Sequence, residues 1–321
     1  MKTRFRNSPF QTWNPLWNPR EPVEIPQQPQ APKWSGRYIN LERSVNRRQH
    51  VENEIERHGL KNRYRRFSAI DGNSNYVASK ISAAEKGIFA SHLALFEEAA
   101  AGSEALHIVE DDVAFSDALV PFIDWIVDSN AIQDYDMVVT DTFISPVSAR
   151  FRWFEKAYAA VRQGKVPAMS NGVALIGMED SYLYGCSSYI VAPAAAARIV
   201  EVLKRAWREG PVAPVDKVLQ DAVLAKELRI GCSMPFVTWL DLKIADASTA
   251  ERRHETAVLW SLQRLLRYLF FVDCDMQNYL EPALDKLVQS NSDRILTRHE
   301  RYAIAVAKRV LAASGAAKKL S

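Results

Sequence analysis

The sequence predicts an α/β fold in which helices flank a largely parallel sheet. Between residues 35 and 250, short strand-like apolar segments alternate with helix-like segments, the usual pattern of a layered parallel sheet. Two of these strands end in carboxylates, at Glu110–Asp112 and at Asp141. Ligands of such sheets bind at the carboxyl ends of the strands, so both acidic clusters mark the expected position of a site.

The first 34 residues are expected to form a flexible arm, because they are rich in Pro, Asn and Gln. Three tryptophans in it, Trp13, Trp17 and Trp34, could dock on the body or on a partner. The alternative is scattered aromatic residues in a disordered arm.

The first half of the body contains strand signals, helix caps and a turn. The expected elements are a strand over 36–41, a helix from Ser44 to Gly59, a strand over 65–70 that runs into the turn Asp71-Gly72, a helix opened by the capping box Ser82–Glu85, and a strand over 105–110.

The second half continues the alternation. The expected elements are a strand over 134–141, a strand over 185–192, a helix from Pro193 to Gly210, a short helix after Pro214 and a last strand over 234–239.

Residues 251–321 are expected to form an added helical C-terminal region. Large apolar residues alternate there with Arg264, Arg267 and further basic residues. Such helices could pack on the body, pair with a second subunit as a homodimer, or lie on an anionic membrane surface.

Composition and charge exclude several classes of partner and site. The formal net charge of +3 is too small to indicate nucleic acid as a partner. Three widely spaced cysteines suggest a reducing compartment and neither a disulfide framework nor a zinc site. No secretory signal or membrane span is expected, so the protein is predicted to be cytoplasmic.

The acidic stretch ALHIVEDDVAF, residues 105–115, predicts a metal site. Carboxylates bind hard cations, and Mg²⁺ or Mn²⁺ sites need only one or two of them when the substrate supplies phosphates. In an extended chain Glu110 and Asp112 project to the same side, with Asp111 opposite. The alternative is a solvated acidic loop.

An ordered set of motifs resembles glycosyltransferase family 25, which includes lipooligosaccharide and collagen galactosyltransferases. The motifs that carry the resemblance are Ile39-Asn40-Leu41 with Arg43, Arg47 and Arg48, then Ala69-Ile70-Asp71-Gly72, Gly87 with Ser91-His92, Glu110-Asp111-Asp112, Gly185 with Tyr189, and Pro214-Val215-Asp216. They span roughly residues 36–245. Ala90 stands where the family commonly has Cys, and Leu240-Asp241 stands where a Gln is expected, which leaves donor and acceptor choice open.

The resemblance implies a GT-A-like, nucleotide-sugar-binding sheet and an inverting transferase. The implied donor is a UDP-sugar, UDP-galactose or UDP-glucose, used with Mn²⁺ or Mg²⁺. The implied acceptor is a saccharide or glycolipid such as bacterial lipopolysaccharide or lipooligosaccharide. The basic C-terminal helices would then place the enzyme on the inner membrane face.

The resemblance also assigns roles to residues, each with a simpler alternative. Asp112 is the first metal ligand, shared with Glu110, and the general base is Asp216 or Asp141, with Asp241 as a further candidate. The residues expected to bind the donor are Asn40, Arg43, Arg47, Asp71, Ser91, His92, Glu110 and Asp111. Asp71 could be a turn residue, Arg47 a solvated helix residue, His92 a hydrogen-bonded core residue and Asp216 a helix cap.

Two rival functions remain at this point. A metal-dependent phosphohydrolase also uses carboxylates at strand ends. A catalytically inactive protein could keep the fold and use the arm and the C-terminal helices for interactions. The chain has no GxxxxGK[ST] phosphate loop, HExxH or GxSxG motif.

Overall fold

The computed structural model describes residues 33–74, 80–143 and 185–241, parts of 153–178, and residues 265–280 with a few neighbours. The expected arm, apart from Lys33 and Trp34, lies outside the described residues. So do residues 245–264 and nearly all of 281–321, which hold most of the expected helical extension.

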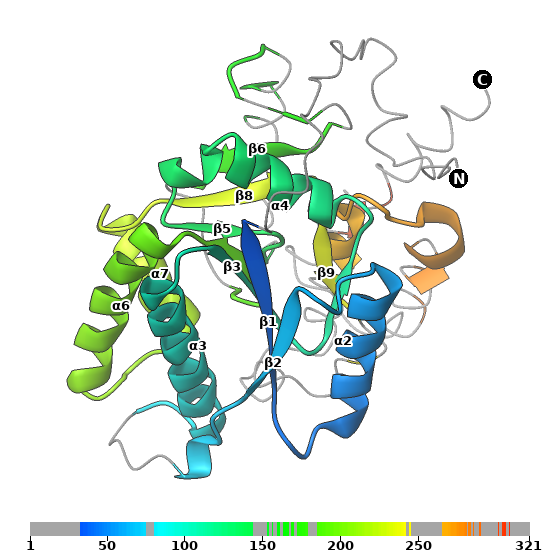
Figure 1. The fold of residues 1–321 in the computed structure, drawn as a ribbon. Helices are drawn as coiled ribbons and strands as arrows, with labels where there is room; N and C mark the ends of the chain where they lie inside the picture. Colours follow the sequence, from blue (N-terminus) through cyan, green and yellow to red (C-terminus); the bar gives the residue numbers. More distant parts are fainter. Residues whose placement is uncertain are drawn as a thin grey trace, which may run out of the picture.

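A seven-stranded sheet forms the centre of the molecule, in the order β2-β1-β3-β7-β5-β8-β6 (Figure 1). Its strands are β1 (Trp34–Asn40), β2 (Tyr64–Ser68), β3 (Ala105–Glu110), β5 (Met137–Val139), β6 (Ala174–Gly177), β7 (Ser188–Val191) and β8 (Ile230–Met234). Five strands run in one direction, while β6 and β7 run against them. The sheet confirms the predicted α/β class and is consistent with a GT-A-like fold.

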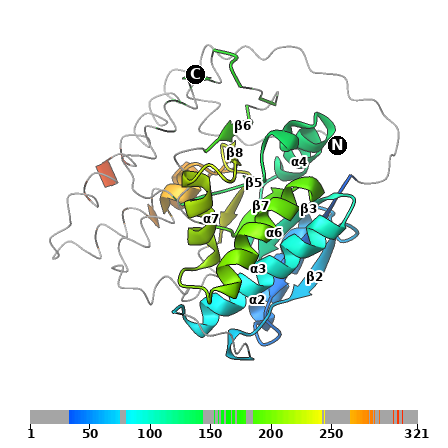
Figure 2. The same cartoon turned by 90° about the vertical axis from the view of Figure 1, so that its left-hand side faces the viewer.

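Helices cover both faces of the sheet. On one face lie α3 (Ala83–Ala101), α6 (Pro193–Arg208) and α7 (Val215–Leu224), with α3 and α6 side by side (Figure 2). The opposite core takes its helical residues from α2 (Val45–Arg57) and α4 (Leu119–Asp128). Alternate residues of β3 enter the two cores, with Leu106 and Ile108 on the α3 side and Ala105 and Val109 on the α2 side.

The predicted helix signals act as expected, except that Ser44, expected to cap α2, forms no side-chain cap hydrogen bond. Ser82 and Glu85 form both hydrogen bonds of a capping box at the start of α3. Gly59 follows α2 with φ 68°, a conformation that glycine adopts without strain. Pro193 opens α6, and Gly210 follows it with φ 78°.

The predicted strand over 234–239 is wrong. Met234 is the last residue of β8, and a cis Met234–Pro235 bond separates it from β9 (Thr238–Leu240). β9 leaves the main sheet and pairs antiparallel with β4 (Val113–Phe115) in a second, two-stranded sheet. Pro235 has no N–H to donate to a ladder, which explains why one strand cannot continue through it.

Trp34 belongs to the body and is not a free part of the arm. It is the first residue of β1, is 1% exposed, and its indole Nε1–H donates to Asp124 Oδ1 at 2.7 Å. β1 therefore begins two residues earlier than the apolar pattern predicts.

The described part of the C-terminal region packs on the body. Leu265, Leu266 and Leu269 are buried in the same core as α3 and α6. Phe271 forms a β-bridge with Phe236, so this segment also continues the backbone pairing next to β8. Of the three arrangements open to the C-terminal region, residues 265–280 adopt packing on the body.

A chain of buried polar side chains crosses the sheet from β2 to β9. Tyr64 Oη contacts His107 Nδ1, and His107 Nε2 lies 3.0 Å from Ser188 Oγ. Thr140 Oγ1 continues the chain, 2.6 Å from Ser188 Oγ and 2.8 Å from Thr238 Oγ1. Burial lowers the pKa of His107 to about 3, so its ring is neutral and can both donate and accept. A shift of register in any of these strands would break the chain.

Two glycines of the motifs, Gly72 and Gly87, meet in a close backbone contact. A Cβ on Gly72 would lie 1.5 Å from the carbonyl oxygen of Ala83, and one on Gly87 would lie 2.5 Å from that of Ile70. Ser91 reinforces the contact, because its Oγ accepts from the Ile70 N–H at 2.9 Å and donates to the Gly87 carbonyl at 2.7 Å. The Ala-x-Asp-Gly turn is thereby fixed to α3.

We expect Gly87→Ala to lower the free energy of unfolding by about 1–3 kcal/mol, because its methyl group would overlap the backbone of Ile70. Urea denaturation followed by circular dichroism measures the change. Gly102→Ala at the other end of α3 is the matched control, since its Cβ would meet nothing nearer than 3.4 Å. Equal stability of the two variants would contradict the close contact.

Candidate active site

The acidic stretch lies at the carboxyl edge of the sheet, between β3 and β4. β3 ends at Glu110, and Asp111 and Asp112 form a turn before β4 begins. The extended geometry therefore stops at Glu110, and the alternation expected over the three carboxylates does not apply to them. Instead, Asp111 and Asp112 both contact the guanidinium group of one arginine.

This arginine is Arg47 of α2. Its Nε lies 2.8 Å from Asp111 Oδ1, and its Nη2 contacts Asp112 Oδ2. Asn40, the last residue of β1, donates from Nδ2 to Asp111 Oδ2 at 2.6 Å and to the Ser44 carbonyl at 3.0 Å. Asn40 and Arg47 thus hold Asp111 in place, and Arg47 is no longer a merely solvated helix residue.

Asp112 has one carboxylate oxygen to spare. The residue is 5% exposed, and its Oδ1 is buried without a hydrogen-bond partner in the described part of the chain. Burial raises its pKa above the ordinary range, Arg47 opposes the rise, and the charges of Glu110 and Asp111 add to it. A buried carboxylate oxygen without a partner is unfavourable, which makes Asp112 a candidate ligand-binding residue.

Glu110 faces α3 and a buried histidine. Its Oε1 lies 3.6 Å from His92 Nε2, while His92 Nδ1 is 2.7 Å from Tyr189 Oη. Burial alone would raise the pKa of Glu110, but His92, Arg47 and Arg267 together lower it. His92 is therefore a core residue that also contacts the acidic cluster.

Asp216 lies in the first turn of α7, close to the same cluster. Its Oδ1 accepts from the Lys217 N–H at 2.9 Å. Burial raises its pKa; backbone hydrogen bonds from Lys217 and Gly185 counter the rise, and the charge of Glu110 adds to it. Asp216 is therefore near enough to Glu110 to respond to its charge.

Asp141, two residues after the end of β5, takes part in a buried ion pair. Its Oδ2 contacts Nη2 of Arg267, and its Oδ1 accepts from Ser187 Oγ at 3.0 Å. Both partners of the pair are 1% exposed. Burial raises the pKa of Asp141, and Arg267 opposes the rise. Because both oxygens are engaged, Asp141 is poorly suited to accept a proton from an acceptor hydroxyl.

The remaining residues expected to bind the donor lie apart from this cluster. Asp71 pairs with Arg43 and accepts from the Asn73 N–H at 3.0 Å, which forms the expected turn. Hydrogen bonds from Asn73, followed by Arg43, lower the pKa of Asp71. Ser91 is 1% exposed and fixes the turn to α3, as described above.

Carboxylates outnumber arginines in this region. Its acidic residues are Glu110, Asp111, Asp112, Asp141 and Asp216, and its arginines are Arg47 and Arg267. In the described residues, no three His, Cys, Asp or Glu side chains are arranged to hold a metal by themselves. The spare Asp112 oxygen nevertheless fits a Mg²⁺ or Mn²⁺ site of the kind in which substrate phosphates supply further ligands.

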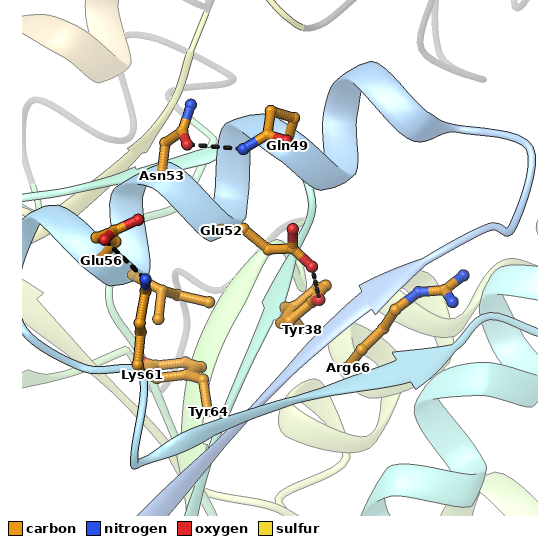
Figure 3. Close-up of a pocket in the computed structure, with 9 residues that line it drawn as sticks. Tyr38, Gln49, Glu52, Asn53, Glu56, Lys61, Tyr64 and Arg66 are labelled. Carbon is orange, nitrogen blue, oxygen red and sulfur yellow. Dashed lines mark hydrogen bonds and ion pairs between the residues drawn. The ribbon is translucent and has the colours of Figure 1, made fainter.

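A separate polar cavity of about 290 Å³ lies between α2 and strands β1 and β2 (Figure 3). Its polar side chains pair with each other: Tyr38 Oη donates to Glu52 at 2.5 Å, and Lys61 Nζ lies 2.7 Å from Glu56. Arg66 at its rim binds Glu42 outside the cavity. The acidic cluster, with unsatisfied atoms, is the better candidate site.

The chain matches the model of a known protein family. The model of glycosyltransferase family 25, described as an LPS biosynthesis protein, matches residues 37–219, more than half of the chain. The chain belongs to glycosyltransferase family 25. This confirms the resemblance drawn from the motifs and identifies a glycosyltransferase of a family described in lipopolysaccharide biosynthesis. Among curated proteins, none matches the chain.

The family 25 match includes the acidic cluster but stops within α7. Asp112, Arg47, Asp141 and Asp216 lie inside it, whereas Arg267 lies outside. In the described part of the chain, no helix is long and apolar enough to cross a bilayer.

Sequence reasoning did not single out Ser187, named Tyr189 only as part of a motif, and gave Arg267 no role in the site. Arg267 was visible only as one basic residue of an amphipathic helix. The signal available was its position in the run LLRYLFF, where apolar residues surround a single arginine. A charge at such a position is buried when it has an acidic partner, but the sequence does not say which acid that is.

We expect Asp112→Asn to stabilise the protein at pH 7.5 in the absence of metal and nucleotide, by about 1–2 kcal/mol. An aspartate ionises near pH ~4 in the unfolded chain, whereas the folded protein raises the pKa of Asp112. The wild type therefore loses stability as the pH rises above the pKa of the unfolded chain. Urea denaturation at several pH values measures the difference, which should vanish in acid. Asp134→Asn, at an exposed carboxylate, is the control. A destabilised Asp112→Asn variant at pH 7.5 would contradict the unsatisfied site.

Proposed function

We propose that this family 25 member transfers a hexose from a UDP-sugar to a saccharide acceptor with inversion at the anomeric carbon. The single observation that carries the proposal is the buried, unpartnered Asp112 oxygen within an excess of negative charge at the carboxyl edge of the sheet. This edge is where ligands of such sheets bind.

Asp112 is the proposed ligand of a Mn²⁺ or Mg²⁺ ion, with Glu110 as its neighbour. When bound, such an ion stabilises the negative charge of a departing diphosphate as a Lewis acid. Arg47 and Asn40 act on Asp111 and keep the acidic turn in position. Asp71 and Arg43, which pair on the surface apart from the acidic cluster, are proposed to contact the nucleoside.

Asp216 is the proposed general base, in preference to Asp141. An inverting transfer needs a group that accepts the proton of the attacking hydroxyl. Asp141 is 1% exposed, and both of its oxygens are bound by Arg267 and Ser187. Asp216 is only partly buried, so an acceptor hydroxyl can reach it more easily. The raised pKa of Asp216 makes it a stronger base than an exposed aspartate, provided that the pH is high enough to ionise it.

The proposed acceptor is a lipopolysaccharide or lipooligosaccharide chain. The family description supports this class. Contact of the basic residues of 251–321 with a membrane surface would bring the enzyme to a lipid-linked acceptor, and the composition of that region supports it. UDP-galactose and UDP-glucose are the donors to examine first.

Calorimetric titration with UDP and a panel of UDP-sugars, with and without Mn²⁺, tests the proposal. We expect Mn²⁺ to strengthen UDP binding, and Asp112→Asn to weaken the Mn²⁺-dependent binding by about tenfold or more. Asp134→Asn should bind as the wild type does. A UDP affinity that changes neither with Mn²⁺ nor with the Asp112 substitution would refute the metal site. Nucleotide binding without turnover on any acceptor would favour the catalytically inactive protein.

We expect Asp216→Asn to lower the rate of sugar transfer by about 10²–10⁴-fold, because the acceptor hydroxyl loses its base. UDP affinity should be unchanged, since Asp216 is not placed among the donor ligands. UDP release in the presence of a saccharide acceptor measures the rate, and titration calorimetry measures the affinity. In the wild type, the rate should rise with pH through the raised pKa of Asp216. An unaffected rate would limit Asp216 to its place at the start of α7.

A further inference from the structure

Arg267 is a buried cation supplied by a part of the chain that the family match does not cover. The match ends at residue 219, while Arg267 lies in the segment 265–280, which packs on the body. Its guanidinium is 1% exposed and reaches the carboxyl edge of the sheet, where it contacts Asp141 and Ser187. The Phe143 ring lies 4.8 Å from the guanidinium carbon.

Three N–H groups of Arg267 have no acceptor among the residues that the structure describes. Nη2 donates to Asp141 and to Ser187, but Nε and Nη1 are buried without a hydrogen-bond partner. Arginine carries one hydrogen on Nε and two on Nη1, in a planar fork that matches carboxylate and phosphate oxygens. Buried charged donors without acceptors are unfavourable, so their presence points to an anionic ligand.

The neighbours of Arg267 indicate which anion it binds. Its charge acts to lower the pKa values of Glu110, Asp112 and Asp141, so it lies near three of the five carboxylates. Asp112 offers a spare acceptor and Arg267 offers spare donors. A diphosphate with a bound divalent cation satisfies both, because it presents a positive charge to Asp112 and oxygen atoms to Arg267.

A second Asp–Arg pair provides a contrast at the other end of β5. Asp136, just before this strand, accepts from Arg198 Nε at 2.6 Å and from the Arg229 N–H at 2.7 Å. No side-chain atom of Asp136 or Arg198 is both buried and unsatisfied in the described structure. The Arg198 side chain is 55% exposed, so water can reach its donors, whereas the Arg267 side chain is 1% exposed and its spare donors are buried.

We propose that Arg267 binds the diphosphate of the nucleotide-sugar donor, so that the segment 265–280 completes the donor site. The inference rests on the proposed function, because it takes a nucleoside diphosphate as the ligand. Arg267 keeps Asp141 as its counter-ion and directs Nε and Nη1 to the phosphate oxygens.

Two variants test the role of Arg267. Neither of them leaves Asp141 buried without a cationic partner while it is charged. Arg267→Lys keeps the positive charge but loses the planar fork. The double variant Asp141→Asn/Arg267→Gln removes both members of the ion pair and leaves no unpaired charge. The matched control is Asp136→Asn/Arg198→Gln, which removes the pair at the other end of β5.

Titration calorimetry with UDP and with uridine separates phosphate binding from folding. We expect both Arg267 variants to lose about tenfold or more in UDP affinity, with uridine affinity unchanged. The control should bind both ligands as the wild type does. Unchanged UDP affinity in both variants, or an equal loss for UDP and uridine, would make Arg267 a structural counter-ion and overturn the inference. A wild type that does not bind UDP would remove the proposed function, and the inference with it.

Discussion

The carboxyl edge of the sheet buries more carboxylates than arginines, and the structure around it is arranged to tolerate that charge. Arg47 reaches it from α2 and Arg267 from the C-terminal segment, so elements more than 200 residues apart are drawn to one place. Asn40 and Ser187, at the ends of two strands of the main sheet, supply neutral donors. What they leave unsatisfied, chiefly at Asp112, is the feature that suits a cationic ligand.

The sequence predicted the elements whose signals are local. The capping box of α3, Gly59 after α2 and Pro193 at the start of α6 each act through neighbouring residues, and all were found. β6 and β8 were missed and the strand over 234–239 was misplaced, because short buried strands carry no periodicity and Pro235 falls between two of them. Only tertiary pairing shows that β9 joins β4.

The residues of the candidate site also fall into those that local sequence signals predicted and those that only the folded chain brings together. A strand that ends in carboxylates can be recognised from sequence, and so Glu110, Asp111 and Asp112 were found as a group. Their counter-ions could not be assigned, because an ion pair such as Asp141–Arg267 joins residues that are adjacent only in the folded chain. The motif around Gly87 and Ser91 was read as part of the binding site, whereas its visible contacts hold a turn against a helix.

The order of residues along the chain has a consequence for how the protein is made. The whole central sheet is encoded before residue 241, but the counter-ion of Asp141 follows at residue 267. A nascent chain that has left the ribosome only as far as β9 can pair its strands, yet it must either bury Asp141 unpaired, keep it protonated or leave that edge open to water. The edge of the sheet that holds Asp141 therefore receives its counter-ion only after all the strands of the sheet have been synthesised.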